Sequence, residues 1–212
     1  MKIDGRVIVL AGATSAAGLA VARALVSAGA RVIATGRSRE RLRALADAGA
    51  DVAVTDATSL EDMTTLAEEL EAVDGVLSLV GGWRGGGGLA GQSDEDFEAL
   101  MPALRAVRAT SRAFDGALQA SDAGRFAIVS STAVARPLAG GANYAAVKAA
   151  SEAWARAVAH GFAKSAKNPG EPLRAASVVF RVKALDPESL AGAVLGLWDA
   201  DAATLNDRVI EL

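Results

Sequence analysis

The sequence predicts a doubly wound α/β domain, in which helices cover both faces of a single parallel sheet. Apolar runs of strand length alternate with longer segments of helical period along the whole chain. The expected strands are almost continuously apolar, as strands buried on both faces of a parallel sheet must be. The chain shows no internal repeat of roughly 20 to 50 residues and no long linker. We therefore expect one domain that spans residues 1–212.

The first half of the chain repeats the order strand, helix, strand. RVIVLA is typical of a strand and leads to Gly12, while GLAVARALVSAG has helical period and closes on Gly29. The alternation continues through SRERLRALADAG, ADVAVTD, SLEDMTTLAEELEA and VDGVLSLV. We expect strands at residues 6–11, 30–36, 50–56 and 73–80, and helices at residues 18–29, 38–49 and 59–72.

The second half continues the pattern with longer helices. Pro102 lies inside the first of these helices and predicts a kink or a restart there. A low-complexity segment, GGWRGGGGLAGQ at residues 81–92, follows the fourth strand. We expect helices at residues 94–121, 143–163 and 187–199, and strands at residues 125–130, 174–180 and 207–212.

Composition narrows the classes of function. Hydrophobic residues make up 51% of the chain, which suffices for one large core. The net charge of -3 gives no overall attraction to nucleic acid or to a lipid surface, so neither is an expected partner. Because the chain has no cysteine and one histidine, His160, it has no disulfide, thiolate nucleophile or multi-histidine zinc site. We expect no metal, although sites made of carboxylates alone stay open.

The N-terminus resembles a signal peptide only superficially. An uncharged run over residues 7–22 follows a basic segment, but Asp4 interrupts that segment, and Gly12 and Gly18 break the run. The run is also shorter than the roughly 20 residues that a membrane span needs. We expect a cytoplasmic protein.

The loop AGATSAAG, between the first strand and the first helix, is a candidate phosphate site. In a doubly wound sheet, ligands bind beyond the carboxyl ends of the strands. Gly12 follows the strand and Gly18 lies at the start of the helix, where backbone N–H groups and the helix dipole attract a pyrophosphate. Thr14 and Ser15 add hydroxyl donors. The alternative is a tight turn with no ligand.

Tyr144 is the only tyrosine of the chain, and Lys148 follows it by four residues. Residues four apart on a helix share a face, so the ammonium group of Lys148 can approach the phenol. A positive charge within about 4 to 6 Å favours the phenolate. The pair is therefore a candidate acid–base group, and the alternative is that Tyr144 only fills the surface.

These motifs resemble the short-chain dehydrogenase/reductase family from about residue 5 to residue 212. AGATSAAG is similar to the family's T-G-x-x-x-G-x-G loop, in which Gly12 and Gly18 match the outer glycines and Ala16 replaces the middle one. The family's serine, tyrosine and lysine match Ser131, Tyr144 and Lys148, and the first two are separated by 13 in residue number. The resemblance implies a Rossmann fold.

The same resemblance implies a reaction and a coenzyme site. Nicotinamide delivers hydride to a carbonyl carbon, Tyr144 donates the proton and Ser131 hydrogen-bonds the substrate oxygen, while Lys148 also holds the nicotinamide ribose. The reverse reaction oxidises an alcohol. Asp56 matches the family's aspartate near the adenine amino group. The resemblance places the coenzyme against Gly12, Thr14, Ser15, Ala17, Gly18, Arg37, Ser38, Asp56, Val80, Gly81, Gly82, Tyr144 and Lys148.

The end of the second strand indicates which coenzyme is used. An acidic residue there bonds the ribose 2′-hydroxyl of NAD, whereas a basic residue accommodates the 2′-phosphate of NADP. The chain reads ATGRSRERLR, with Arg37 and Ser38 at this place. We expect NADP(H), with NAD(H) as the less favoured alternative. Arg41 and Arg43, farther along, are interpreted as part of a solvated helix face.

The chain departs from the family around the nicotinamide. Most relatives carry Asn-Asn-Ala-Gly after the fourth strand, whereas this chain reads SLVG at residues 78–81. Many relatives hold a relay water with an asparagine in the long helix. The matching position is Ala103, or Leu104 if the register slips by one. The proton relay from Lys148 must therefore use another route, or turnover is slow.

The C-terminal third departs further. Relatives have Pro-Gly after the sixth strand and later a threonine at the carboxamide, where this chain has Phe180, Arg181 and then Leu185. The substrate-covering loop is much shortened, so we expect an open cleft. This passage and VGGWRGGGG also resemble dihydropteridine reductases. That branch typically prefers NADH and lacks the serine, so Arg37 and Ser131 argue against a close match.

Three functions stay open at this point. The leading one is an NADP(H)-dependent oxidoreductase of small carbonyl or alcohol substrates. The second is a dihydropteridine-type reductase. The third is a catalytically weak NADP-binding scaffold or redox sensor, which has no need of the intact Tyr144. Relatives pair the helices that correspond to residues 94–121 and 143–163 across a two-fold axis, so we expect a homodimer or homotetramer.

Overall fold

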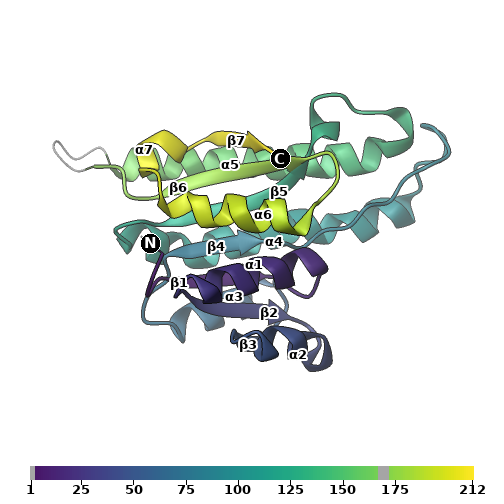
Figure 1. Cartoon of the computed structure of the whole chain (residues 1–212). Helices are drawn as coiled ribbons and strands as arrows, with labels where there is room; N and C mark the ends of the chain where they lie inside the picture. Colours follow the sequence, from purple (N-terminus) through teal and green to yellow (C-terminus); the bar gives the residue numbers. More distant parts are fainter. Residues whose placement is uncertain (1–2, 167–171) are drawn as a thin grey trace.

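The computed structural model describes residues 3–166 and 172–212. Within these residues, seven parallel strands form one sheet in the order β3-β2-β1-β4-β5-β6-β7 (Figure 1). The strands are β1 (Val7–Ala11), β2 (Arg31–Gly36), β3 (Asp51–Val54), β4 (Gly75–Ser78), β5 (Arg125–Ser131), β6 (Ala176–Val182) and β7 (Arg208–Glu211). The helices are α1 (Ala16–Ser27), α2 (Arg39–Asp47), α3 (Leu60–Glu68), α4 (Asp94–Ala120), α5 (Ala142–Ser165), α6 (Pro187–Leu195) and α7 (Ala202–Leu205).

Two apolar layers cover the two faces of the sheet. Helices α1 and α6 pack together on one face, and α4 packs against both α3 and α5 on the other (Figure 1). Buried side chains of α1, α2 and α6 in the first layer include Val21, Leu42 and Val194. Buried side chains of α3, α4 and α5 in the second layer include Met63, Phe114 and Phe162. The predicted doubly wound fold is confirmed.

The central strand β1 shows why the expected strands are apolar throughout. Ile8 and Leu10 enter the first layer, whereas Val9 and Ala11 enter the second. Successive side chains of a strand point to opposite faces, so a strand covered on both sides needs no polar positions. All four side chains are fully buried.

The connections place a crevice beside β1. Val9 pairs with Ile33 of β2 on one side and with Val76 of β4 on the other. The chain moves outward from β1 to β3 in one direction and then from β4 to β7 in the other. Helices after β1 and after β4 therefore diverge, which opens a crevice at the carboxyl ends of these strands.

Three details differ from the expected elements. Helix α4 continues unbroken through Pro102, so the predicted restart is wrong. The buried residues Leu100 and Ala103 on either side of Pro102 hold the helix in place, and their packing offsets the lost backbone hydrogen bond. The last helix ends early, because Gly196–Trp198 forms a 3₁₀ turn, and the short helix α7 follows.

Among residues 3–166 and 172–212, no helix is long and apolar enough to cross a membrane. In the same residues, no group of three or more histidine, cysteine or acidic side chains is arranged to hold a metal ion.

Candidate active site

The turn after β1 brings the backbone very close to the end of β4. Gly12 has a φ of +77°, and a Cβ there would lie 2.4 Å from Val80 Cγ2. The N–H of Gly12 donates to Thr35 Oγ1 at 3.2 Å, which ties this turn to β2. Any side chain at this position would therefore both strain the backbone and push β4 away.

The start of α1 is capped from within the same turn. Ser15 Oγ accepts a hydrogen bond from the N–H of Gly18 at 3.1 Å. A Cβ at Gly18 would lie 2.1 Å from the carbonyl oxygen of Ala13. Gly18 thus permits the close turn, but its N–H is already bonded and is not the free donor that the sequence predicts. The hydroxyl proton of Ser15 stays available for a ligand.

The Arg37 cavity, of about 210 Å³, lies where the loops after β1, β2 and β3 meet. A Cβ at Gly36 would lie 2.7 Å from Thr14 Cγ2, so this glycine lets the first two loops touch. Arg37 is exposed at the mouth and forms no ion pair within the described part of the chain. The lining includes Gly12, Thr14, Ser15, Arg37, Ser38, Arg41, Asp56, Val80 and Gly81.

Two of these residues differ from the sequence-based interpretation. Arg41 lines the cavity rather than only a solvated face, because Ser38 caps α2 through the N–H of Arg41 and turns the first helical turn toward it. Asp56 is engaged locally: its Oδ1 accepts from both the N–H and the hydroxyl of Thr58, at 2.9 and 2.8 Å. Its N–H donates to Asp62, a bond that lowers the pKa of the Asp62 carboxyl.

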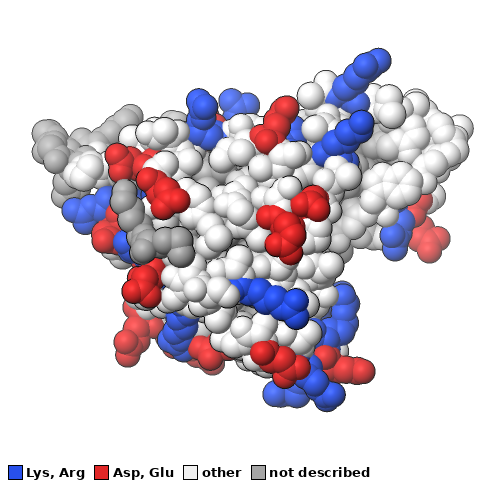
Figure 2. Space-filling view, in the orientation of Figure 1, with Lys and Arg blue, Asp and Glu red and all other residues white. Residues whose placement is uncertain are grey.

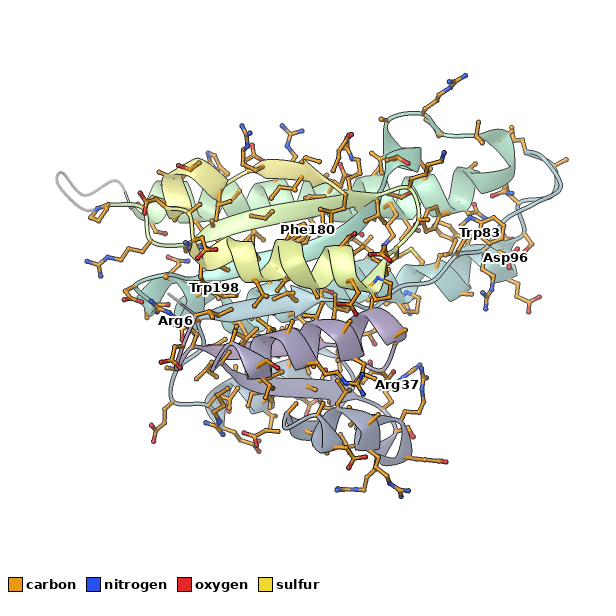
Figure 3. All side chains as sticks on the ribbon, viewed as in Figure 1. Arg6, Arg37, Trp83, Asp96, Phe180 and Trp198 are labelled. Atoms are coloured by element: carbon orange, nitrogen blue, oxygen red, sulfur yellow. The ribbon has the colours of Figure 1, made fainter. Side chains whose placement is uncertain are left out.

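The Lys148 cavity, of about 370 Å³, continues the crevice toward β5 and β6. It shares Ser15, Leu79, Val80 and Gly81 with the Arg37 cavity, so the two form one crevice across the end of the sheet. Figure 3 labels one residue from each part: Arg37 lies at the lower right, and Trp83 lies above it, in the part of the molecule that projects to the right. The lining adds Ala17, Gly82, Trp83, Tyr144, Lys148 and Lys183.

Lys148 is almost fully buried beside Tyr144. Its Nζ donates to the carbonyl oxygen of Val129 at 2.7 Å and lies 5.8 Å from the centre of the Tyr144 ring. Burial lowers the pKa of Lys148 to about 8, and the negative charge of Glu152 opposes this shift. The predicted neighbourhood of the tyrosine and the lysine on one helix face is present in the structure.

The Leu138 cavity, of about 720 Å³, adjoins the Lys148 cavity at Tyr144. Ser131 ends β5 on its wall, and Ser131 Oγ accepts from the N–H of Ala133 at 3.1 Å. Its hydroxyl proton is left free to donate. Tyr144 and Lys183 line both this cavity and the Lys148 cavity. The serine and the lysine of the sequence motif therefore line two adjoining cavities that share the tyrosine.

An ionic network around the buried Glu152 is absent from the sequence-based interpretation. Arg181 donates to both oxygens of Glu152, from Nε to Oε1 at 3.1 Å and from Nη2 to Oε2 at 2.6 Å. Ser130 Oγ also donates to Glu152 Oε1, at 2.6 Å. Glu152 lies one helical turn beyond Lys148, which is a signal that the sequence does contain. Its partner Arg181 comes from β6 and has no local signature.

The crevice and the fold define the class of α/β oxidoreductases that bind a nicotinamide coenzyme beyond the carboxyl ends of their strands. The model of the short chain dehydrogenase family matches residues 6–166. The chain belongs to this family.

Curated relatives agree with this assignment. A 3-oxoacyl-[acyl-carrier-protein] reductase FabG of Salmonella typhimurium is 30% identical over 156 residues, which cover 70% of this chain and 64% of the relative. The galactitol 2-dehydrogenase (L-tagatose-forming) of Cereibacter sphaeroides is 37% identical over 150 residues, which cover 64% of this chain and 58% of the relative. The matched region thus spans less than two thirds of each of these relatives.

Solved structures share the fold over the whole chain. A metagenomic short-chain oxidoreductase in complex with NADP has a TM-score of 0.82 at 24% identity, and covers 100% of this chain and 99% of its own. A gluconate 5-dehydrogenase from Burkholderia cenocepacia J2315, in complex with NADP and tartrate, has a TM-score of 0.82 at 22% identity, over 99% and 94% of the two chains. At these identities the likeness concerns the fold.

Proposed function

We propose that this chain is an NADP(H)-dependent oxidoreductase that transfers hydride between nicotinamide and a small carbonyl or alcohol substrate. One observation carries the proposal: Tyr144 lies on the wall between the cavity that holds Lys148 and the cavity that holds Ser131. The three side chains that such a reaction needs therefore line two adjoining cavities, which share Trp83, Tyr144 and Lys183. Residues 1–212 act as a single coenzyme-binding domain with a shortened substrate loop, since four residues join β6 to α6.

The residues at the crevice fit a dinucleotide. Glycines at positions 12 and 36 let the backbone approach where a Cβ would collide with a neighbour. Ser15 and Thr14 offer hydroxyls beside the start of α1, where a pyrophosphate is favoured. These features favour a polar ligand along this edge.

When bound, the nicotinamide coenzyme supplies or accepts the hydride. Tyr144 donates a proton to the carbonyl oxygen in reduction and withdraws it in oxidation. Ser131 donates its free hydroxyl proton to the same oxygen and orients the carbonyl, because its own oxygen is occupied by the N–H of Ala133. The buried ammonium of Lys148 favours the phenolate of Tyr144 electrostatically and is placed to hold the nicotinamide ribose.

The coenzyme preference rests on Arg37 and Arg41. Both line the Arg37 cavity, and neither forms an ion pair within the described residues, so both are available to a 2′-phosphate. Arginine suits phosphate because its planar guanidinium can donate two parallel hydrogen bonds. The NADP complexes of two structural neighbours support the same choice.

The proton leaves the site without the relay asparagine. Ala103 is buried on α4 and its methyl group holds no water. Tyr144 is partly exposed and borders the wide Leu138 cavity. We propose that Tyr144 exchanges its proton with solvent through this opening, which the short connection between β6 and α6 leaves uncovered.

Two measurements test the proposal. NADPH and NADH titrations by calorimetry give the two dissociation constants, and a panel of aldehydes and ketones is then assayed by the oxidation of NADPH. We expect tighter binding of NADPH and turnover that Tyr144→Phe removes. A protein that binds neither coenzyme, or an activity indifferent to Tyr144→Phe, would contradict the assignment.

A dihydropteridine-type reductase is the second candidate. The observation that favours it is Trp83, which borders both the Lys148 cavity and the Leu138 cavity and can stack on a flat ring. Reduction of a quinonoid dihydropterin faster than of any aldehyde in the panel would decide for it. A catalytically weak NADP-binding scaffold would instead bind NADPH and turn over nothing.

We also propose a cytoplasmic homodimer or homotetramer. Helices α4 and α5 pack side by side. The outer surface of α5 permits close approach of a second copy, because it exposes Ala146, Ala149, Ala150, Ala153, Ala157 and Ala163. Light scattering at micromolar concentration tests the assembly, and a monomer mass there would overturn it.

A further inference from the structure

We propose that the Leu138 cavity selects carbonyl compounds that carry a carboxylate on an apolar body. This rests on the proposed reductase function and adds the substrate class to it. The cavity, of about 720 Å³, has the size of a small-molecule site, and Tyr144 places the reacting oxygen at one end of it. The other residues that line the cavity indicate which further chemical groups the substrate contains.

The charged residues of the cavity are both cations. Arg136 lies in the loop after β5, and Lys183 lies directly after β6. Neither forms an ion pair within the described residues, and no acidic residue is among the described residues that line this cavity. The chain as a whole carries a net charge of -3, so an all-cationic wall is a local feature. Figure 2 shows separate blue side chains on a largely white surface at the upper right of the molecule.

The opposite part of the wall is apolar. Trp83 and Leu138 are 62% and 69% exposed, although both are large hydrophobic side chains. They come from segments far apart in the sequence and border the same cavity. Exposed apolar side chains that converge on a cavity indicate a ligand with an apolar body. An aromatic or branched carbon skeleton between the carbonyl and the carboxylate meets this wall.

Hydrogen bonds fix the two segments relative to each other. Gly86 N–H donates to the carbonyl oxygen of Gly140 at 2.7 Å, and Gln92 Nε2 donates to the same oxygen at 3.1 Å. The N–H of Asn143 donates to Gln92 Oε1, also at 3.1 Å. The glycine-rich segment at residues 81–92 is therefore a braced arm beside α5 rather than a featureless linker (Figure 1). The apolar wall is held in place before a substrate arrives.

Arg136 and Lys183 differ in the number of cavities that they border, and the choice of variants depends on this difference. Lys183 borders the Lys148 cavity as well, so it can also attract a phosphate of the coenzyme. Arg136 borders only the Leu138 cavity among the cavities described here. A guanidinium group can bind a carboxylate through two parallel hydrogen bonds. Arg136 is therefore the residue from which the preference for an anion is expected to come.

The experiment compares a matched pair of ligands, 4-acetylbenzoate and 4-acetylbenzamide. Both have the same size and the same ketone, but only the first is charged. Calorimetry measures their binding to the protein with oxidised NADP, in which the ketone is not reduced, and a second arm measures NADPH oxidation by each. The variants are Arg136→Gln, Arg136→Gln with Lys183→Gln, and Arg105→Gln as a control that removes one exposed positive charge on α4.

We expect the benzoate to bind at least tenfold more tightly than the amide, roughly 1.4 kcal/mol. Arg136→Gln should remove most of this preference without changing the dissociation constant of NADPH, and Arg105→Gln should leave the preference intact.

Three results would overturn the inference: equal binding of the two ligands, failure of both to bind at millimolar concentration, or a preference that survives the double substitution. Turnover of both ligands with equal efficiency would overturn it and leave the proposed reductase function standing. Tight anion binding without any turnover would support the inference and count against the reductase function.

Discussion

The two ends of the crevice are built in different ways. At the Arg37 end, glycines bring three loops together and the polar contacts are mostly with backbone groups, as with Gly12 and Gly18. At the Lys148 end, charged side chains from two elements meet, and the buried carboxylate of Glu152 pairs with the partly buried guanidinium of Arg181. The first end depends on glycine positions that tolerate no side chain. The second depends on partners that only the complete fold brings together.

The largest expected effect comes from breaking the buried pair. Arg181→Leu leaves the carboxylate of Glu152 buried with a single hydroxyl donor and without its bidentate partner. Removing one member of a buried ion pair costs about 3 to 5 kcal/mol. We expect the lower part of this range, because Lys148 still attracts Glu152. Denaturant unfolding of the coenzyme-free protein measures it.

Two controls sharpen this prediction. Arg156→Leu breaks an exposed ion pair with Asp207 and should cost less than about 1 kcal/mol. The double variant Glu152→Leu with Arg181→Leu should recover much of the stability that Arg181→Leu loses, because no uncompensated charge is then left inside. Equal losses in Arg181→Leu and Arg156→Leu would show that the pair contributes no more than a surface contact.

Next in size is the effect of the phenol oxygen. Tyr144→Phe keeps the ring between the two cavities and removes the proton donor, so kcat should fall about a hundredfold or more. The dissociation constant of NADPH should change less than twofold, because the phenol does not hold the coenzyme phosphates. Steady-state kinetics and titration measure the two quantities. Near wild-type turnover would reduce Tyr144 to a packing residue.

The same contrast explains what the sequence could predict. The alternation of strands and helices along the chain, the glycine turn and the spacing of Tyr144 and Lys148 are local patterns, and the structure contains each of them. The bidentate bond between Glu152 and Arg181 joins α5 to β6 over 29 positions. No periodicity or motif links two such residues. The inward role of Arg41 was missed for a related reason, since it depends on how Ser38 starts α2.

The segment at residues 81–92 shows a second limit of prediction from the sequence. Its composition suggests an unstructured connection, yet the glycines permit close contacts. A Cβ at Gly85 would lie 2.4 Å from the carbonyl oxygen of Gly140. Composition alone cannot separate glycine that loosens a chain from glycine that lets two backbones meet, because the difference lies in a partner segment distant in the sequence.

The buried charge of Lys148 should cost stability in the coenzyme-free protein. Its folded-state pKa of about 8 is below the ordinary 10.5, so between these pH values the unfolded chain holds a proton that the folded chain has lost. Stability therefore rises with pH across this window, and the full penalty applies below pH 8. We expect Lys148→Met to be about 1 to 2 kcal/mol more stable at pH 7, after the loss of the bond to Val129.

Denaturant unfolding at pH 7 and pH 9.5 checks this expectation. The gain in Lys148→Met should shrink at the higher pH, where the wild type has already lost the proton, and catalytic activity should be lost at both. Lys164→Met, which replaces an exposed lysine of the same helix, should show neither change. A Lys148→Met variant less stable than the wild type at pH 7 would mean that the ammonium group is well solvated or paired.

The smallest effect is expected at the Arg37 end of the crevice. It tests whether this end determines the preference for NADPH over NADH. Arg37→Ala removes an exposed side chain that makes no ion pair among the described residues, so the fold should be unaffected. NADPH should bind about tenfold more weakly, roughly 1.4 kcal/mol, because the 2′-phosphate loses a charged donor. Binding of NADH, which lacks that phosphate, should stay within twofold.

Arg39→Ala is the matched control, since Arg39 is exposed on the same helix start and does not line the cavity. Calorimetric titration of both coenzymes against the three proteins decides the matter. If Arg37→Ala leaves the preference intact, Arg41 carries it, and the double variant Arg37→Ala with Arg41→Ala should then abolish it. A preference that survives even this change would mean that the glycine turn and its hydroxyls, rather than the arginines after β2, distinguish the two coenzymes.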